Sequence, residues 1–338
     1  MKNTLFSLIV LFSVCNLHSQ LELINGGPVN VPSEGVIDGI YIKEHVPTKR
    51  MIAYEDVREA DVIWNRRVWS YIDLREKINH SMYYPFDDYT FPDGVWIKNN
   101  TRWSLWTVIK HNIYESNLTI YEPKNPLSGD QGPFDGDQFK YPLKSQNNLN
   151  YASDKAFKDK VDGYLNIISN KRFVAIPSEI DGSDSVTIDP ATQLSTVVTK
   201  DTFDLIRIKS ENIVQYRLKE EWFFDKERSV LDKRILGLAP VIYDQTKEGG
   251  KYVELFWLYF PECRLVFNNY FVYNELNDAQ WMSFDDLFWK RRFNAVMYKE
   301  SNVYDRGIDT YKNGVDALHE AERIKEGIRT IEHDVWNF

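Results

Sequence analysis

Apolar and polar residues alternate between positions 214 and 224, and this pattern constrains the fold more than any other stretch. One face collects the apolar side chains of Val214, Tyr216, Leu218, Trp222 and Phe224. The other face collects Gln215, Arg217, Lys219 and Glu221. Because successive side chains of a strand point to opposite sides, this alternation predicts a half-buried β-strand, with Glu220 as an exception on its apolar face.

Neighbouring segments supply partners for this strand. The polar residues 225–229 predict a turn, and residues 230–243 are expected to return as the second strand of a hairpin. Residues 252–260 predict a further, largely buried strand, and residues 118–123 a short one. These segments together indicate a mainly antiparallel sheet.

Helices are predicted from apolar spacings of three and four and from cap residues. Residues 54–82 predict an amphipathic helix that ends before Pro85. Ser104 is expected to cap a helix over 105–117, and Pro261 to begin another. Ser283 and Asp286 resemble a capping box. The last predicted helix, over 314–338, has one apolar stripe formed by Val315, Leu318, Ala321, Ile324, Ile328 and Ile331.

These elements predict an α+β fold, with amphipathic helices packed on a mainly antiparallel sheet, an extended N-terminal arm and a C-terminal helix. Residues 1–19 have the basic start and short apolar run of a signal peptide. Residues 20–50 contain three prolines and no helical periodicity, and they predict an extended arm or linker. Whether this arm is a flexible leader or lies on a neighbouring subunit stays open.

Composition narrows the function classes. The net charge of −9 disfavours a nucleic-acid binder, because phosphate neutralisation requires excess positive charge. The chain has 10 Trp, 20 Tyr and 19 Phe, residues that suit cores and protein interfaces. If the signal peptide is removed, Cys263 is the one remaining cysteine and no internal disulfide can form.

No catalytic or cofactor motif is present in the sequence. The histidines lack metal-ligand spacing, and there is no nucleophile elbow or phosphate-binding loop, so no cofactor is predicted. Cys263 is interpreted as a buried thiol. The aspartates of 130–137 and 181–189 could offer oxygens to calcium but are better interpreted as solvated turns. Glu220 and Glu221 are expected to point to opposite faces of a strand, and Asp285 and Asp286 to favour a helix start.

A motif of Trp-x-Arg-Arg, an apolar residue and a second apolar residue four positions later occurs twice, beginning at Trp64 and at Trp289. On a helix these apolar positions form one stripe, so each copy predicts a helix packed on one face. The arginines beside each stripe would pair with carboxylates such as Asp73, Glu76 or Asp285.

Core packing and protein docking remain two compatible readings of this motif, whereas catalysis is disfavoured. The candidate structural or interface residues are Trp64, Arg66, Arg67, Trp69, Asp73, Arg75, Trp289, Arg291, Arg292 and Phe293.

Three long stretches resemble the GldN (PorN) family of the Bacteroidetes type IX secretion and gliding machinery. Residues 58–85 resemble its N-terminal signature, residues 259–308 its C-terminal signature, and residues 314–338 its closing helix. The resemblance implies GldN-like segments over 51–123 and 201–338, joined by a turn-rich connecting region over 124–200.

The resemblance also implies a function. Such a chain would be a non-enzymatic scaffold subunit of a periplasmic ring, exported by its signal peptide and required for protein secretion and gliding. Its implied partners are a GldK/PorK-like lipoprotein, the periplasmic region of a GldM/PorM-like protein, and neighbouring ring subunits, with indirect membrane association. The alternative is a periplasmic peptidoglycan- or glycan-binding module or hydrolase.

Overall fold

The computed structural model describes residues 51–90, 94–96, 102–126, 134–144, 151–175, 186–188, 195–197, 199–244, 250–277, 280 and 282–335. The predicted signal peptide and arm lie outside these residues. Contacts divide the chain into two compact units. One unit combines the residues up to Asp154 with those from Lys209 onward, and the other is Lys155–Ile208. The domain boundaries predicted from the sequence stay predictions.

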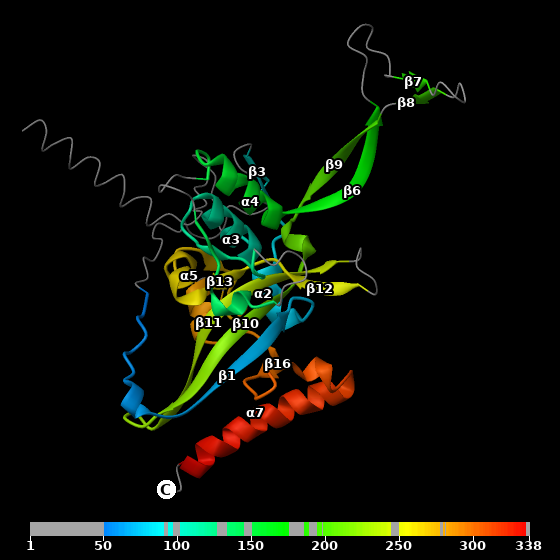
Figure 1. Cartoon of the computed structure of the whole chain (residues 1–338). Helices are drawn as coiled ribbons and strands as arrows, with labels where there is room; N and C mark the ends of the chain where they lie inside the picture. The colour runs from blue at the N-terminus through cyan, green and yellow to red at the C-terminus, as the bar shows by residue number, and fades with distance from the viewer. Residues whose placement is uncertain are drawn as a thin grey trace, which may run out of the picture. The chain divides into compact units, whose positions relative to one another are not determined.

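An antiparallel sheet forms the centre of the first unit (Figure 1). Among the described residues its strand order is β16-β1-β10-β11-β13-β4-β5, with β12 also pairing with β11. The strands are listed here with their bounds: β1 (Val62–Asp73), β4 (Ile120–Tyr121), β5 (Pro142–Leu143), β10 (Ile213–Asp225), β11 (Val230–Asp244), β12 (Lys251–Glu254), β13 (Trp257–Tyr259) and β16 (Val296–Glu300).

The alternating stretch is confirmed as a strand. It lies within β10, which pairs with β1 on one side and with β11 on the other. The hairpin of β10 and β11 turns at residues 226–229, close to the predicted position. The strand predicted over 252–260 is wrong in its extent, because the chain forms two short strands, β12 and β13, and then enters a helix at Phe260.

The helix predicted over 54–82 is wrong over most of its length, because residues 62–73 form strand β1. The apolar residues that suggested it, Trp64, Val68 and Ile72, are four positions apart. A spacing of four residues places side chains on one face of a strand, and also on one face of a helix. The many β-branched and aromatic residues of this segment favour a strand, and a long antiparallel pairing with β10 stabilises it.

Three helices begin or end where the local residues predict. Helix α2 (His80–Tyr83) ends just before Pro85. Helix α3 (Leu105–Tyr114) is capped by Ser104, whose hydroxyl accepts a hydrogen bond from the Thr107 amide at 3.2 Å. Helix α5 (Phe260–Phe267) has proline in its first turn, as predicted.

The second predicted Trp-x-Arg-Arg helix is also wrong beyond its first turns. The capping box of Ser283 and Asp286 is confirmed, and it opens helix α6 (Phe284–Trp289). The helix ends at Trp289, and Arg291 adopts a left-handed backbone with a φ of 50°. The chain then continues into strand β16. The predicted stripe of Trp289, Phe293 and Met297 therefore does not form on one helix.

The C-terminal helix α7 (Val315–Val335) lies along one face of the sheet beside β1 and β16 (Figure 1). Its buried residues Ala321, Ile324 and Ile328 pack with apolar side chains of the sheet, which are Trp64, Val68, Trp222, Leu231, Val296 and Met297. The predicted stripe is only partly correct, because Val315 and Leu318 are exposed. Ala317, the neighbour of Leu318, packs against this cluster instead.

Smaller elements complete the two units. In the first unit, β2 (Asp88–Thr90) pairs with β3 (Gly94–Trp96), and β14 (Phe271–Val272) pairs with β15 (Met282–Ser283). The second unit contains helix α4 (Lys155–Leu165) and two strand pairs. These pairs are β6 (Asn166–Ala175) with β9 (Thr199–Arg207), and β7 (Val186–Ile188) with β8 (Ser195–Val197).

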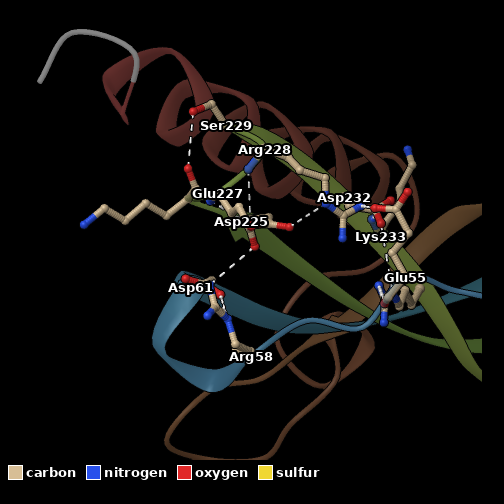
Figure 2. A network of polar contacts seen from close by, with 11 residues as sticks. Glu55, Arg58, Asp61, Asp225, Glu227, Arg228, Ser229, Asp232 and Lys233 are labelled. Carbon is tan, nitrogen blue, oxygen red and sulfur yellow. Dashed lines mark hydrogen bonds and ion pairs between the residues drawn. The ribbon is translucent and has the colours of Figure 1, made fainter.

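A polar network joins the segment before β1 to the turn between β10 and β11 (Figure 2). Arg228 forms ion pairs with Glu55 and with Asp225, the latter at 3.0 Å. The Asp61 carbonyl accepts a hydrogen bond from the Lys226 amide at 2.8 Å. The segment 51–61 is thereby held against the end of the hairpin by side-chain and main-chain contacts.

We expect the contact between α7 and the sheet to depend on Ile324. Replacing Ile324 by alanine removes buried apolar contacts and should lower the free energy of unfolding by about 2–4 kcal/mol. The matched control on the same helix is Leu318→Ala, at a side chain that is 52% exposed, and it should change stability by less than about 0.5 kcal/mol. Urea unfolding measures both values, and equal losses would contradict this packing.

We also expect stability to depend on His111 of helix α3 below neutral pH. Burial beside Trp103 and Tyr270 lowers the pKa of this imidazole, while Glu115 acts in the opposite direction. The unfolded chain therefore binds the proton more readily, so stability should fall as the pH falls through the ordinary histidine range. The variant His111→Gln should lose less stability between about pH 7.5 and 5.5, where carboxylates stay mostly charged. Parallel pH curves for the two proteins would contradict this expectation.

Candidate functional site

The first motif copy lies on β1, and its residues divide between the two faces of the sheet. Trp64 and Val68 contact the cluster beneath α7. Arg67 and Trp69 lie on the opposite face, where they stand across from Glu221 and Lys219 of β10. The motif therefore contributes to a core on one side and to an open surface on the other.

A groove of about 860 Å³ lies on that open surface. It is lined by strands β1, β10 and β16 and by residues 134–140 and 301–305. Each basic side chain that lines it stands within 4 Å of a carboxylate. These pairs are Arg66 with Glu300 at 2.8 Å, Arg67 with Glu221 at 3.8 Å, Lys140 with Asp135 at 3.4 Å, Lys219 with Asp137 at 3.6 Å and Lys299 with Asp305 at 2.6 Å.

Trp69 lines this groove and is mostly buried, because its ring also packs in a core cluster with Ala239 and Trp257. Its indole Nε1 donates a hydrogen bond to Asp137 Oδ2 at 3.0 Å. The ammonium groups of Lys219 and Lys299 lie 5.8 and 4.6 Å from the centre of its ring. The ring is therefore fixed at its polar edge and covered by cations on its surface, so it is held in one orientation.

Lys219 links the groove to the sheet. Its side chain is almost fully buried, and Nζ donates a hydrogen bond to the Asp137 carbonyl oxygen at 2.6 Å. Burial lowers the pKa of this ammonium group, whereas Asp137 raises it. Asp137 belongs to a stretch that the sequence analysis interpreted as solvated turns, and that interpretation is wrong at this residue. Nothing in the spacing of Asp137 indicated its contact with Trp69, 68 positions earlier in the chain.

Asp73 and Arg75 lie at the end of β1 and pair with each other. Arg75 Nε and Nη2 donate to the Asp73 carboxylate at 3.0 and 2.6 Å. Partial burial acts to raise the pKa of Asp73, but the hydrogen bonds from Arg75 outweigh it and hold the pKa below its usual value. The prediction that Asp73 and Glu76 pair with Arg66 or Arg67 is wrong. Glu76 instead accepts a hydrogen bond from Asn294 at 2.7 Å.

The second motif copy lies at the end of α6, and its four candidate residues contact different neighbours. Trp289 stacks on Tyr54, with ring centres 5.3 Å apart. Arg292 donates a hydrogen bond to Asn274 at 3.1 Å. Phe293 is buried and contacts Phe288, with ring centres 5.7 Å apart. These contacts anchor the loop that leads from α6 into β16.

Arg291 forms a contact between the loop after α6 and the central strand β10. Its guanidinium lies 2.7 Å from Glu220, a carboxylate that is 1% exposed on the apolar face of β10. Glu220 was the exception in the alternating pattern, and Arg291 is its partner. A buried carboxylate without a cation would be costly, so this pair couples the loop after α6 to the central strand.

A cavity of about 300 Å³ contains another buried ion pair. Arg264 of α5 binds Asp285 through two hydrogen bonds of 2.8 and 3.2 Å. Its guanidinium carbon lies 4.2 and 4.9 Å from the rings of Tyr54 and Trp289. The sequence analysis expected Asp285 to pair with a motif arginine. That expectation is wrong, because Asp285 pairs with Arg264. Arg264 was not a candidate, and its position in α5 carried no signal of this role.

The cavity also holds the start of the described chain. Arg264 Nη2 donates a hydrogen bond to the carbonyl oxygen of Ile52 at 2.6 Å. Arg234 of β11 donates to the carbonyl oxygen of Glu55 at 2.6 Å. We call this set, Ile52, Tyr54, Glu55, Arg234 and Arg264, the N-terminal clamp.

Within the described part of the chain, no three histidine, cysteine or acidic side chains gather as metal ligands would. Cys263 is buried, and burial raises the pKa of its thiol well above the usual range, so the sulfur stays protonated and unreactive. Glu220 and Glu221 point to opposite faces, as predicted, and pair with Arg291 and Arg67.

A comparison with protein-family models matches residues 57–337 to the gliding motility associated protein GldN. The match includes both motif copies, the groove and helix α7. The chain belongs to the GldN family. A comparison with curated proteins finds no match.

Membership of the GldN family makes the chain a component of the gliding motility and type IX secretion machinery. The resemblance seen in the sequence is thereby confirmed. The GldN family is a structural component of that machinery. Its partners are other proteins of the same machinery. No described helix has both the length and the apolar character needed to span a bilayer.

We expect the motif arginines to differ sharply in their effect on stability. Arg291→Met leaves the buried Glu220 without its cation and should cost about 2–4 kcal/mol. Arg67→Met removes the partner of the more exposed Glu221 and should cost less than about 1 kcal/mol. The double variant Arg291→Met, Glu220→Gln should recover part of the loss. Urea unfolding of the wild type, the two single variants and the double variant measures these costs. Equal losses of stability for Arg291→Met and Arg67→Met would contradict the expected difference.

Proposed function

We propose that the chain is a non-enzymatic scaffold subunit of the periplasmic ring of the type IX secretion system. In this role it is exported by its signal peptide and contacts a GldK/PorK-like lipoprotein, which supplies the link to the outer membrane. Its other partners are the periplasmic region of a GldM/PorM-like protein and neighbouring copies of itself. Protein export, and gliding where the organism glides, would require it.

The observation that carries this proposal is the groove in which basic and acidic side chains are paired around a fixed tryptophan. Protein interfaces combine an aromatic anchor with a polar rim of this kind. A site for a phosphate or another small anion would instead leave several cations without carboxylates. The paired charges are suited to exchange partners with charges on another protein surface.

A hydrolase is less well supported by these residues. A glycoside hydrolase needs two carboxylates facing one substrate, one of them able to donate a proton. The acidic residues considered for that chemistry are used in ion pairs and in a helix cap. Asp285 pairs with Arg264, Asp286 caps α6, and Glu220 and Glu221 lie on opposite faces.

We expect the double variant Arg66→Glu, Arg67→Glu to weaken assembly without unfolding the chain. Both guanidiniums are partly exposed beside the groove, so reversal places like charges against Glu300 and Glu221 and against any acidic partner surface. Co-isolation of ring partners from mildly solubilised envelopes should fall severalfold, and secretion should fall with it. The measurements are mass spectrometry of the isolate and export of native cargo.

The matched control reverses two exposed arginines of α7, in the variant Arg323→Glu, Arg329→Glu. These residues pair with acids of the same helix surface, so partner yield should stay near that of the wild type. Melting temperatures of both variants separate assembly from folding. Normal ring yield and secretion in the groove variant would overturn the role of the groove. Binding of the purified chain to peptidoglycan without any partner protein would instead support the glycan-binding alternative.

A further inference from the structure

Strand β1 is longer than the strand beside it. It spans twelve residues, Val62–Asp73, and pairs with β10 over its whole length apart from one irregularity near Val62. On its other side β16 pairs with β1 only from Val68 to Tyr71. Among the described residues, no strand pairs with this side of residues 62–66, which we call the open edge.

The open edge presents main-chain groups that can form hydrogen bonds. The Arg67 carbonyl accepts a hydrogen bond from the Ser301 amide at 2.9 Å, so the Arg67 peptide groups face the β16 side. Main-chain groups of alternate residues in a strand point the same way, and those of Asn65 therefore face the open edge. An unpaired strand edge of this kind is a template for another extended segment.

The open edge is continuous with the groove. Asn65 and Arg66 belong to both, and Arg67 and Trp69 follow them in the lining of the groove. Side chains along this stretch are accessible, with Ile63 being 56% exposed. A strand added here would form main-chain hydrogen bonds to β1 and would place every second side chain over the groove, the usual arrangement in recognition by strand addition.

The N-terminal arm, residues 20–50, has the chemistry of such a strand. Its stretch 36–42 is rich in β-branched and aromatic residues, which favour extended pairing. Residues 20–42 include Glu22, Glu34 and Asp38 and no lysine or arginine. Arg66 of the open edge and the neighbouring Arg67 pair with Glu300 and Glu221, and they can exchange these partners for the acidic residues of the arm.

The N-terminal clamp fixes where the arm leaves its own copy. The clamp holds the chain just after residue 50 to Arg234 of β11 and to Arg264. In the strand order, β11 and β16 flank the pair β1 and β10, so the clamp and the open edge lie toward opposite sides of this part of the sheet. A donor on one side and an acceptor on the other create a head-to-tail contact between copies, which can propagate or close into a ring.

We infer that residues 20–50 of one copy pair as an added strand with the open edge of β1 in the next copy. The inference deepens the proposed scaffold role by naming the contact between copies. It rests on that role only because the scaffold requires copies of the chain to associate. It concerns two copies of this chain alone, so it can be tested without secretion partners.

The test uses photo-crosslinking of the full-length chain. A photoreactive phenylalanine replaces Ile63, and ¹⁴N and ¹⁵N preparations are mixed before irradiation. Mass spectrometry should then find residue 63 joined to residues 20–50 in mixed-isotope pairs. Crosslinks to residues 20–50 without any mixed-isotope pairs would show that each copy binds its own arm. Crosslinks only to other segments, or none, would show a different occupant or an empty edge. Each of these results overturns the inference.

A proline at the edge supplies the matched control. Asn65→Pro removes the outward N–H of β1, which β10 does not use, and should lower the mixed-isotope crosslink severalfold. Asn65→Ala keeps that N–H and removes only the side chain. Its crosslink yield should therefore match that of the photoreactive chain that retains Asn65. Equal yields for proline and alanine would overturn the strand pairing. Loss of secretion in the groove variant together with no crosslink would reject this inference and leave the scaffold role standing.

Discussion

The pairing of β10 with strands on both sides is the constraint on which the rest of the first unit depends. Its main chain is hydrogen bonded to β1 and to β11, so its side chains must alternate between two faces. One face forms the core under α7, and the other contributes Lys219 and Glu221 to the groove. A shift of one residue in this register would exchange the two faces and destroy both surfaces.

Cations lie against aromatic rings both in the groove and in the cavity. Lys219 and Lys299 lie over Trp69 in the groove, and Arg264 lies beside Tyr54 and Trp289 in the cavity. In each case a carboxylate fixes the cation from another side. Such triads hold large side chains in one orientation, which is useful for a surface that must fit a protein partner.

Local rules of the sequence predicted a substantial part of this fold. The strand around 214–224, the hairpin that follows it, the caps at Ser104 and Ser283 and the C-terminal helix all formed as expected. Each of these depends on residues close together in the chain. The prediction failed at the first motif copy, because a spacing of four is compatible with a helix and with a strand. Local spacing alone could not decide between them. It failed at the second because helix α6 ends at Trp289 and Arg291 adopts a left-handed backbone.

The sequence by itself determined the family and the local elements, because long signatures and cap residues act over a few turns or strands. It also singled out the residues of the Trp-x-Arg-Arg motif as candidates for a structural or interface role. Tertiary structure alone decided which partners they meet: Arg291 with Glu220, Trp69 with Asp137, and Arg264 with Asp285. These pairs join segments from 21 to 71 positions apart, since 291 minus 220 is 71, and such contacts exist only once strand pairing has brought the segments together. The physical reason is that a buried charge or indole N–H is costly unless it has a partner, and burial is a property of the assembled sheet and helices.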